Sequence, residues 1–114
     1  MASDRIIPDD PLAFIRRCVH ERKIFRTYHV QMRLKGRTLS REALLQAVNT
    51  YEIIESYPDD KYLPSYLLYG DSQEGVCHLH IATDVAGDNV RVVTVYRPST
   101  DEWESDWRTR RRES

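Results

Sequence analysis

Three side chains in this chain have the types and spacing that suit phosphodiester cleavage. His29 and Arg33 are four residues apart, so on a helix they would share one face. A neutral histidine can take the proton of a 2′-hydroxyl group, and an arginine beside it can hold the phosphate. His78 and His80 are two apart in an expected strand and therefore point to the same side. We predict His29, Arg33 and His80 as catalytic residues, with His80 as the second acid–base group.

A second group of polar residues surrounds the expected strands. Residues 57–66 hold three tyrosines and the only basic residue between positions 42 and 90, Lys61. Tyrosine rings can stack on unpaired bases, and a lysine can pair with phosphate; equally, two prolines and paired aspartates make a rigid connection. Tyr96, at the end of the last strand, is predicted as a fourth catalytic residue. The predicted RNA-binding residues are Arg26, Arg37, Lys61, Tyr62 and Arg97.

Other kinds of site have weaker support in the sequence. Cys18 and His20 together with Cys77 and His78 offer four possible zinc ligands, but their spacing matches no strong zinc pattern. A glycine-rich phosphate loop, a nucleophile elbow and a paired-cysteine motif are all missing from the sequence. We therefore expect no metal and no cofactor.

Helices are expected in the first half of the chain. Asp10 and Pro11 suit the start of a helix, and Leu12, Ile15 and Val19 then form one apolar stripe with Cys18. A second, short helix is predicted between Thr27 and Gly36. A third is predicted from Ser40 to Asn49.

Strands are expected in the second half. Four short runs rich in valine, isoleucine and tyrosine are separated by turn-forming residues. The runs are 51–57, 66–69, 76–83 and 90–96. Loops this short favour antiparallel neighbours. Trp103 and Trp107 are four apart, which favours a short C-terminal helix or tail. The predicted fold is α+β, with two to three N-terminal helices packed on a four-stranded antiparallel β-meander.

Charge is divided between the two halves. Residues 12–41 carry nine basic residues and one acid, whereas residues 42–90 carry nine acids and one base, so the halves have charges of +8 and −8 around a net −1. A basic face can attract phosphate although the total is near zero. The alternatives are two solvated surfaces, or two halves that pair between copies in a homodimer.

The length and composition fit one domain over residues 1–114, with residues 1–8 and 109–114 as frayed tails. No apolar run approaches the length of a membrane span, and the first residues do not have the pattern of a secretory signal, so we expect neither. Its two cysteines require no disulfide. A cytoplasmic location without membrane contact is the simplest interpretation.

An ordered set of motifs resembles a bacterial family, domain-of-unknown-function family 4258, over residues 13–107. It consists of His29 and Arg33, residues 53–60, residues 64–67, residues 79–81, residues 93–98 and Trp103. The resemblance implies the barnase–EndoU–colicin–RelE toxin fold, here called RelE-like. It also implies metal-independent RNA cleavage, often as the toxin of a toxin–antitoxin pair. His29, Arg33, His80 and Tyr96 match the recurring polar positions of that family.

Two functions from different classes follow. The first is an RNA endonuclease that acts on single-stranded RNA and pairs with a cognate antitoxin. The second is a non-catalytic interaction module or homodimeric accessory domain, in which the acidic half or the tyrosine-rich segment binds a partner.

Overall fold

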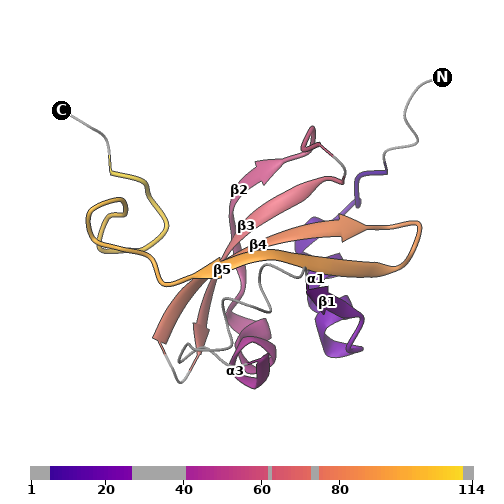
Figure 1. The fold of residues 1–114 in the computed structure, drawn as a ribbon, viewed down its shortest axis with the longest axis horizontal. Helices are drawn as coiled ribbons and strands as arrows, with labels where there is room; N and C mark the ends of the chain where they lie inside the picture. Colours follow the sequence, from indigo (N-terminus) through magenta and orange to yellow (C-terminus); the bar gives the residue numbers. More distant parts are fainter. Residues whose placement is uncertain (1–5, 27–40, 62, 73–74, 112–114) are drawn as a thin grey trace.

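A computed structural model describes residues 6–26, 41–61, 63–72 and 75–111. In chain order the elements are α1 (Pro11–His20), β1 (Ile24–Arg26), α3 (Arg41–Gln46), the 3₁₀ helix η1 (Ala47–Thr50), β2 (Glu52–Tyr57), β3 (Ser65–Ser72), β4 (Gly75–Asp84) and β5 (Asn89–Tyr96). The strands form one sheet, and α1 and α3 lie below it in Figure 1. Among these residues no helix has both the length and the apolar character needed to cross a bilayer.

The predicted fold class was wrong in its sheet. The sheet has five strands in the order β1-β5-β4-β3-β2, and β1 runs parallel to β5 with Ile24 opposite Val90. The four predicted strands are present and pair antiparallel in sequence order. The fifth was missed because three residues after a helix carry no periodic signal, and their partner lies far along the chain. The architecture is therefore a mixed sheet.

The predicted helices also need correction. The first helix forms as expected: Asp10 Oδ1 accepts a hydrogen bond from the Ala13 amide at 3.1 Å, and Pro11 occupies the first turn. The second predicted helix, from Thr27 to Gly36, lies outside the described residues. In place of the third, six residues of α3 pass directly into the four-residue η1.

One face of the sheet, the apolar face, carries the hydrophobic core. Ile15, Cys18 and Val19 from α1 and Ala47 and Val48 from η1 pack there against the strands. The strands contribute Tyr66, Leu68, Cys77, Leu79, Ile81, Val90, Val92 and Val95. The pattern of β4 agrees with the sequence prediction, because its odd-numbered residues 77, 79 and 81 are in the core and His78 and His80 point the other way.

A β-bulge decides which residues of β5 join the opposite, polar face. Register shifts between His80 and Ile81, since His80 pairs with Thr94 whereas Ile81 pairs with Val92, and Val93 is the extra residue. Without the bulge, strict alternation from Val92 would place Thr94 on the apolar face. With it, Thr94 and Tyr96 stand beside the histidines. The polar face carries Glu55, Tyr57, Ser65, Leu67, Tyr69, His78, His80, Thr94 and Tyr96.

The residues after β5 form a folded loop, which we call the C-terminal segment (residues 97–111; yellow at the left of Figure 1). Of the two alternatives predicted from Trp103 and Trp107, a short C-terminal helix or a tail, the helix does not form. Trp107 has a φ of 62°, which a right-handed helix cannot contain, and Trp103 instead makes an antiparallel bridge with Arg110. Trp103 is buried against His78, with ring centroids 4.4 Å apart. The segment therefore covers one end of the polar face.

Candidate functional site

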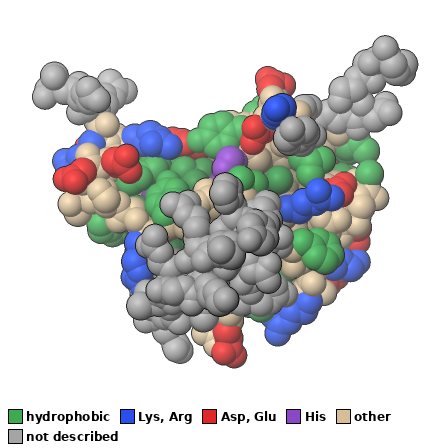
Figure 2. All heavy atoms as spheres, viewed as in Figure 1, with side chains coloured by type: hydrophobic (Ala, Val, Ile, Leu, Met, Phe, Trp, Pro, Cys, Tyr) green, Lys and Arg blue, Asp and Glu red, His purple; other side chains and the backbone are tan. Residues whose placement is uncertain are grey.

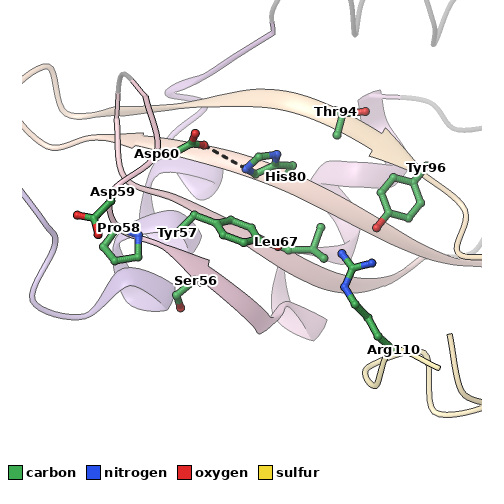
Figure 3. A pocket seen from close by; sticks show the side chains of 10 residues that line it. All are labelled: Ser56, Tyr57, Pro58, Asp59, Asp60, Leu67, His80, Thr94, Tyr96 and Arg110. Carbon is green, nitrogen blue, oxygen red and sulfur yellow. Dashed lines mark ion pairs between the residues drawn. The ribbon is translucent and has the colours of Figure 1, made fainter. Parts of the chain in front are cut away.

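A cavity of about 640 Å³ opens on the polar face beside the C-terminal segment. Its walls come from the β2–β3 connection, the polar face of the sheet and Arg110 (Figure 3). The lining residues are Ser56, Tyr57, Pro58, Asp59, Asp60, Leu67, His80, Thr94, Tyr96 and Arg110. Figure 3 shows the rings of His80 and Tyr57 in its middle, the aspartates at one end, and Tyr96 and Arg110 at the other.

Hydrogen bonds assign the proton of His80. Ser65 Oγ lies 2.5 Å from Asp60 Oδ2 and 2.8 Å from His80 Nε2. A carboxylate can only accept, so the Ser65 hydroxyl donates to Asp60 and must accept from His80 Nε2–H. The remaining nitrogen, Nδ1, then carries the lone pair, and no described residue bonds to it. His80 is therefore held in the tautomer that can act as a base.

The surroundings keep His80 neutral. Burial lowers the pKa of its imidazole, and the nearby Asp60 carboxylate, 3.6 Å from Nε2, opposes that shift. The Tyr57 ring meets the imidazole edge-on with centroids 5.6 Å apart and closes one side. A neutral imidazole with a free lone pair is the form that general-base catalysis requires.

Arg110 is fixed at the other end by a two-point ion pair. Its Nε and Nη2 atoms donate to Glu55 Oε2 at 2.6 Å and Oε1 at 3.1 Å. The Tyr57 hydroxyl donates to the same carboxylate, and the guanidinium lies over the Trp103 ring, 4.6 Å from its centroid. The hydrogen bonds from Arg110 lower the pKa of Glu55, and those to Glu55 raise the pKa of Arg110. The result is a permanently charged guanidinium in a fixed orientation.

The cavity is electrically polarised along its length. Asp59 and Asp60 give the end near the β2–β3 connection a negative charge, whereas at the other end the positive charge of Arg110 is balanced by Glu55. A phosphate would therefore be repelled from the aspartate end, and the N–H groups of Arg110 are the cationic donors at the opposite end. In the view of Figure 2 a histidine side chain reaches the surface among hydrophobic side chains, with charged side chains toward the edges.

Two of the predicted site residues meet in this cavity, His80 and Tyr96. They are diagonal neighbours across β4 and β5, a relation that puts side-chain origins roughly 7–8 Å apart. Arg97 is exposed and follows Tyr96 directly, whereas Lys61 is exposed and is not among the lining residues. Arg26 lies in the edge strand β1, separated from β4 by β5. His29, Arg33, Arg37 and Tyr62 lie outside the described residues.

Arg110 and Glu55 belong to the site but were not identified from the sequence. Arg110 falls within residues 109–114, which were predicted only as a frayed tail, and Glu55 falls within the predicted strand 51–57 without a role of its own. Alternation in β2 places Glu55 and Tyr57 on one face, so that signal was available. No sequence rule brings Arg110 to Glu55, because the turn that returns the C-terminal segment depends on tertiary packing.

The zinc alternative is not supported by the positions of its ligands. Cys18 and Cys77 are buried in the core of the apolar face, whereas His78 points to the polar face. Within the ranges that the structure describes, no group of three or more histidine, cysteine or acidic side chains is placed to hold a metal ion.

Comparison with known families gives one match. Residues 26–97 match the family model described as Domain of unknown function (DUF4258), which is more than half of the chain. The chain belongs to the DUF4258 family. The match is shorter than the predicted 13–107, so His80 and Tyr96 lie inside the DUF4258 region and Arg110 outside it. Neither curated proteins nor solved structures gave a match, and the RelE-like grouping therefore has no support from these comparisons.

Proposed function

We propose that this protein is a metal-independent endonuclease of single-stranded RNA. The observation that carries the proposal is the convergence of His80, Tyr96 and Arg110 in one cavity. A general base, a hydroxyl and a fixed guanidinium are sufficient for attack by a ribose 2′-hydroxyl on the adjacent phosphate. Because the DUF4258 description assigns no activity, the proposal rests on this chemistry alone.

The reaction can be written with each proton accounted for. His80 Nδ1 takes the proton of the 2′-hydroxyl, and the 2′-oxygen forms a bond to phosphorus. The bond from phosphorus to the 5′-oxygen breaks, that oxygen takes a proton from water in the open cavity, and the resulting hydroxide takes the proton from His80. Arg110 balances the charge that develops on the phosphoryl oxygens. The products are a 2′,3′-cyclic phosphate and a free 5′-hydroxyl.

Cleavage of single-stranded RNA in EDTA, followed by analysis of the new ends, tests the proposal. We expect cyclic phosphate ends, and His80→Ala should lower the rate by about 10²–10⁴-fold, the usual effect of losing a general base. The matched control is His20→Ala, because His20 is exposed on α1 and does not line the cavity. Equal rates for wild type and His80→Ala, or no cleavage by either, would overturn the proposal.

Arg110 has a matched control within the same segment. Arg110→Ala should lower the rate by about 10²–10³-fold, since it removes a donor that stabilises developing negative charge. Arg111→Ala should leave the rate near that of wild type, because Arg111 contacts Glu104 and the Thr100 carbonyl and does not line the cavity. An equal effect of both substitutions would mean that general positive charge, and no particular group, attracts the RNA.

The charge-paired homodimer has less support than cleavage. Arg17 and Lys23 of the basic half both pair with Asp88 of the acidic half, at 2.5 and 2.7 Å. Arg108 and Arg110 likewise pair with Glu52 and Glu55. Part of the charge that would hold two copies together is thus neutralised within one chain. A cognate antitoxin and a cytoplasmic location remain part of the proposal. Co-purification of this protein with the product of a small neighbouring gene would test whether it has an antitoxin.

A further inference from the structure

A second histidine, His78, is buried beside the cavity and has both ring nitrogens occupied. Its Nε2 atom lies 2.6 Å from the Trp107 carbonyl oxygen, and its Nδ1 atom lies 3.2 Å from the Tyr96 hydroxyl. A carbonyl oxygen only accepts, so Nε2 carries the hydrogen and Nδ1 carries the lone pair. The Tyr96 hydroxyl must therefore donate its hydrogen to His78.

The ring of His78 is fixed from several sides. Trp103 and Tyr96 both meet it edge-on, with centroids at 4.4 and 5.3 Å, and the side chain has no exposed surface. Burial lowers the pKa of His78, and Arg110 acts in the same direction, while the Trp107 carbonyl and Glu55 oppose it. The imidazole is accordingly neutral at pH 7, and Nδ1 stays available as an acceptor.

This arrangement fixes the role of Tyr96. A tyrosine hydroxyl has one hydrogen, and here it points away from the cavity toward His78, so the oxygen offers lone pairs to a ligand. We infer that His78 is a positioning residue that holds Tyr96 as a hydrogen-bond acceptor for a ribose 2′-hydroxyl of bound RNA. The inference rests on the proposed function and specifies how the site selects its substrate.

The choice of the 2′-hydroxyl follows from what lies beside Tyr96. The guanidinium of Arg110 at the same end can donate to a phosphate, but phosphate oxygens carry no hydrogen to give to an acceptor. In the sugar–phosphate backbone the 2′-hydroxyl is the group that donates, and it distinguishes RNA from DNA. His80 takes the hydroxyl that attacks, so the one that reaches Tyr96 belongs to a neighbouring nucleotide. The pair formed by His78 and Tyr96 would thus favour ribose.

The test measures binding without cleavage. In a His80→Ala background, ribose and 2′-fluoro oligonucleotides of the same sequence are titrated in EDTA by fluorescence anisotropy. Fluorine cannot donate, so we expect the ribose strand to bind about 2- to 12-fold more tightly, the range that one net hydrogen bond gives. Adding His78→Phe should abolish that preference, because the Tyr96 hydroxyl can then turn and donate. His20→Phe is the matched control and should retain it.

A second variant keeps the test decisive if His78→Phe does not fold. Tyr96→Phe retains both rings and removes only the hydroxyl, so it should also abolish the preference. It should shift the ¹⁵N signal of His78 Nδ1, whereas the protonated Nε2 should keep its bond to the Trp107 carbonyl. An unchanged Nδ1 signal would show that the hydrogen bond is not made in solution and would overturn the inference.

The outcomes separate this inference from the proposed function. If wild type cleaves RNA and both variants keep the ribose preference, His78 is only structural and the inference fails alone. If the preference follows base sequence and is indifferent to the sugar, Tyr96 faces a base and the inference also fails. If wild type neither cleaves nor binds RNA, the proposed function fails and the inference with it.

Discussion

The apolar and polar faces of the sheet are covered by different means. On the apolar face α1 and η1 pack through side chains such as Ile15, Val19 and Val48, which leave almost no exposed surface. On the polar face the C-terminal segment is held by Trp103 and by ion pairs from Arg108 and Arg110 to Glu52 and Glu55. Apolar packing is non-directional and closes gaps, whereas ion pairs fix orientation and leave space between them. The cavity lies on the face with directional contacts.

Substitution of Trp103 tests whether this one buried side chain supplies most of the stability of the C-terminal segment on the polar face. Trp103→Ala should lower the free energy of unfolding by about 3–5 kcal/mol, the usual cost of removing a buried large aromatic side chain. Trp107→Ala should cost about 1 kcal/mol or less, because Trp107 is only partly buried and contacts His78 through its backbone carbonyl. Urea unfolding measures both. Equal costs would mean that Trp103 does not anchor the segment.

Leu67 and Leu68 offer a direct comparison of the two faces. They are adjacent in β3, are 4% and 0% exposed, and point to opposite faces. Leu68→Ala should cost about 2–5 kcal/mol, since it leaves a closed void in the core. Leu67→Ala should cost less, because Leu67 borders a cavity that is already open to solvent. If the two costs in thermal or urea unfolding are the same, the faces do not differ in packing.

The two faces should respond to opposite ends of the pH range. On the polar face burial lowers the pKa of His78 and of His80, so the unfolded chain binds protons first. Stability should therefore be complete above about pH 6.5, the ordinary histidine value, and fall as pH drops below it. On the apolar face burial raises the pKa of Cys18 and of Tyr66, so the unfolded chain loses these protons first as pH rises. The stability that these two groups contribute should therefore be lost only above about pH 9.

Unfolding at a series of pH values checks both limits. Tyr96→Phe leaves the two histidines in place, so this variant should still lose stability as pH falls below about 6.5. His78→Phe should make the decrease in unfolding free energy with falling pH less steep, because the substitution removes one of the two buried groups that become protonated on unfolding. A loss between pH 6.5 and 5 that is identical in wild type and His78→Phe would show that His78 does not contribute.

The smallest expected effect lies where α1 leaves the apolar face. The amides of Arg22 and Lys23 return to the carbonyls of Val19 and Cys18, a Schellman ending that places Arg22 at a φ of 62°. Arg22→Gly should raise stability by about 0.5–1 kcal/mol, since relief of the left-handed conformation exceeds the chain entropy that glycine adds. Arg22→Ala retains the Cβ atom and should give no such gain in thermal unfolding. A gain from both would point to charge instead of backbone strain.

The difference between the faces also explains what the sequence could predict. The helix start at Asp10, the stripe with Ile15 and Val19, and the alternation of β4 are local patterns, and each was found from the sequence. The face of the sheet to which His80 points was predicted for the same reason. The parallel partner of β1 and the return of Arg110 to Glu55 are long-range contacts with no local period, so both were missed. Trp103 and Trp107 have helical spacing, but the conformation of Trp107 breaks the helix.

The bulge at Val93 has a consequence for how the site tolerates changes in strand length. It absorbs one additional residue in β5, so Thr94 and Tyr96 lie on the polar face although strict alternation through Val93 would turn them to the apolar face. Deleting Val93 would give a regular strand in which Thr94 still lies opposite His80 and Tyr96 still lies opposite His78. A gap of one residue at Val93 in an alignment of relatives is therefore compatible with the same site.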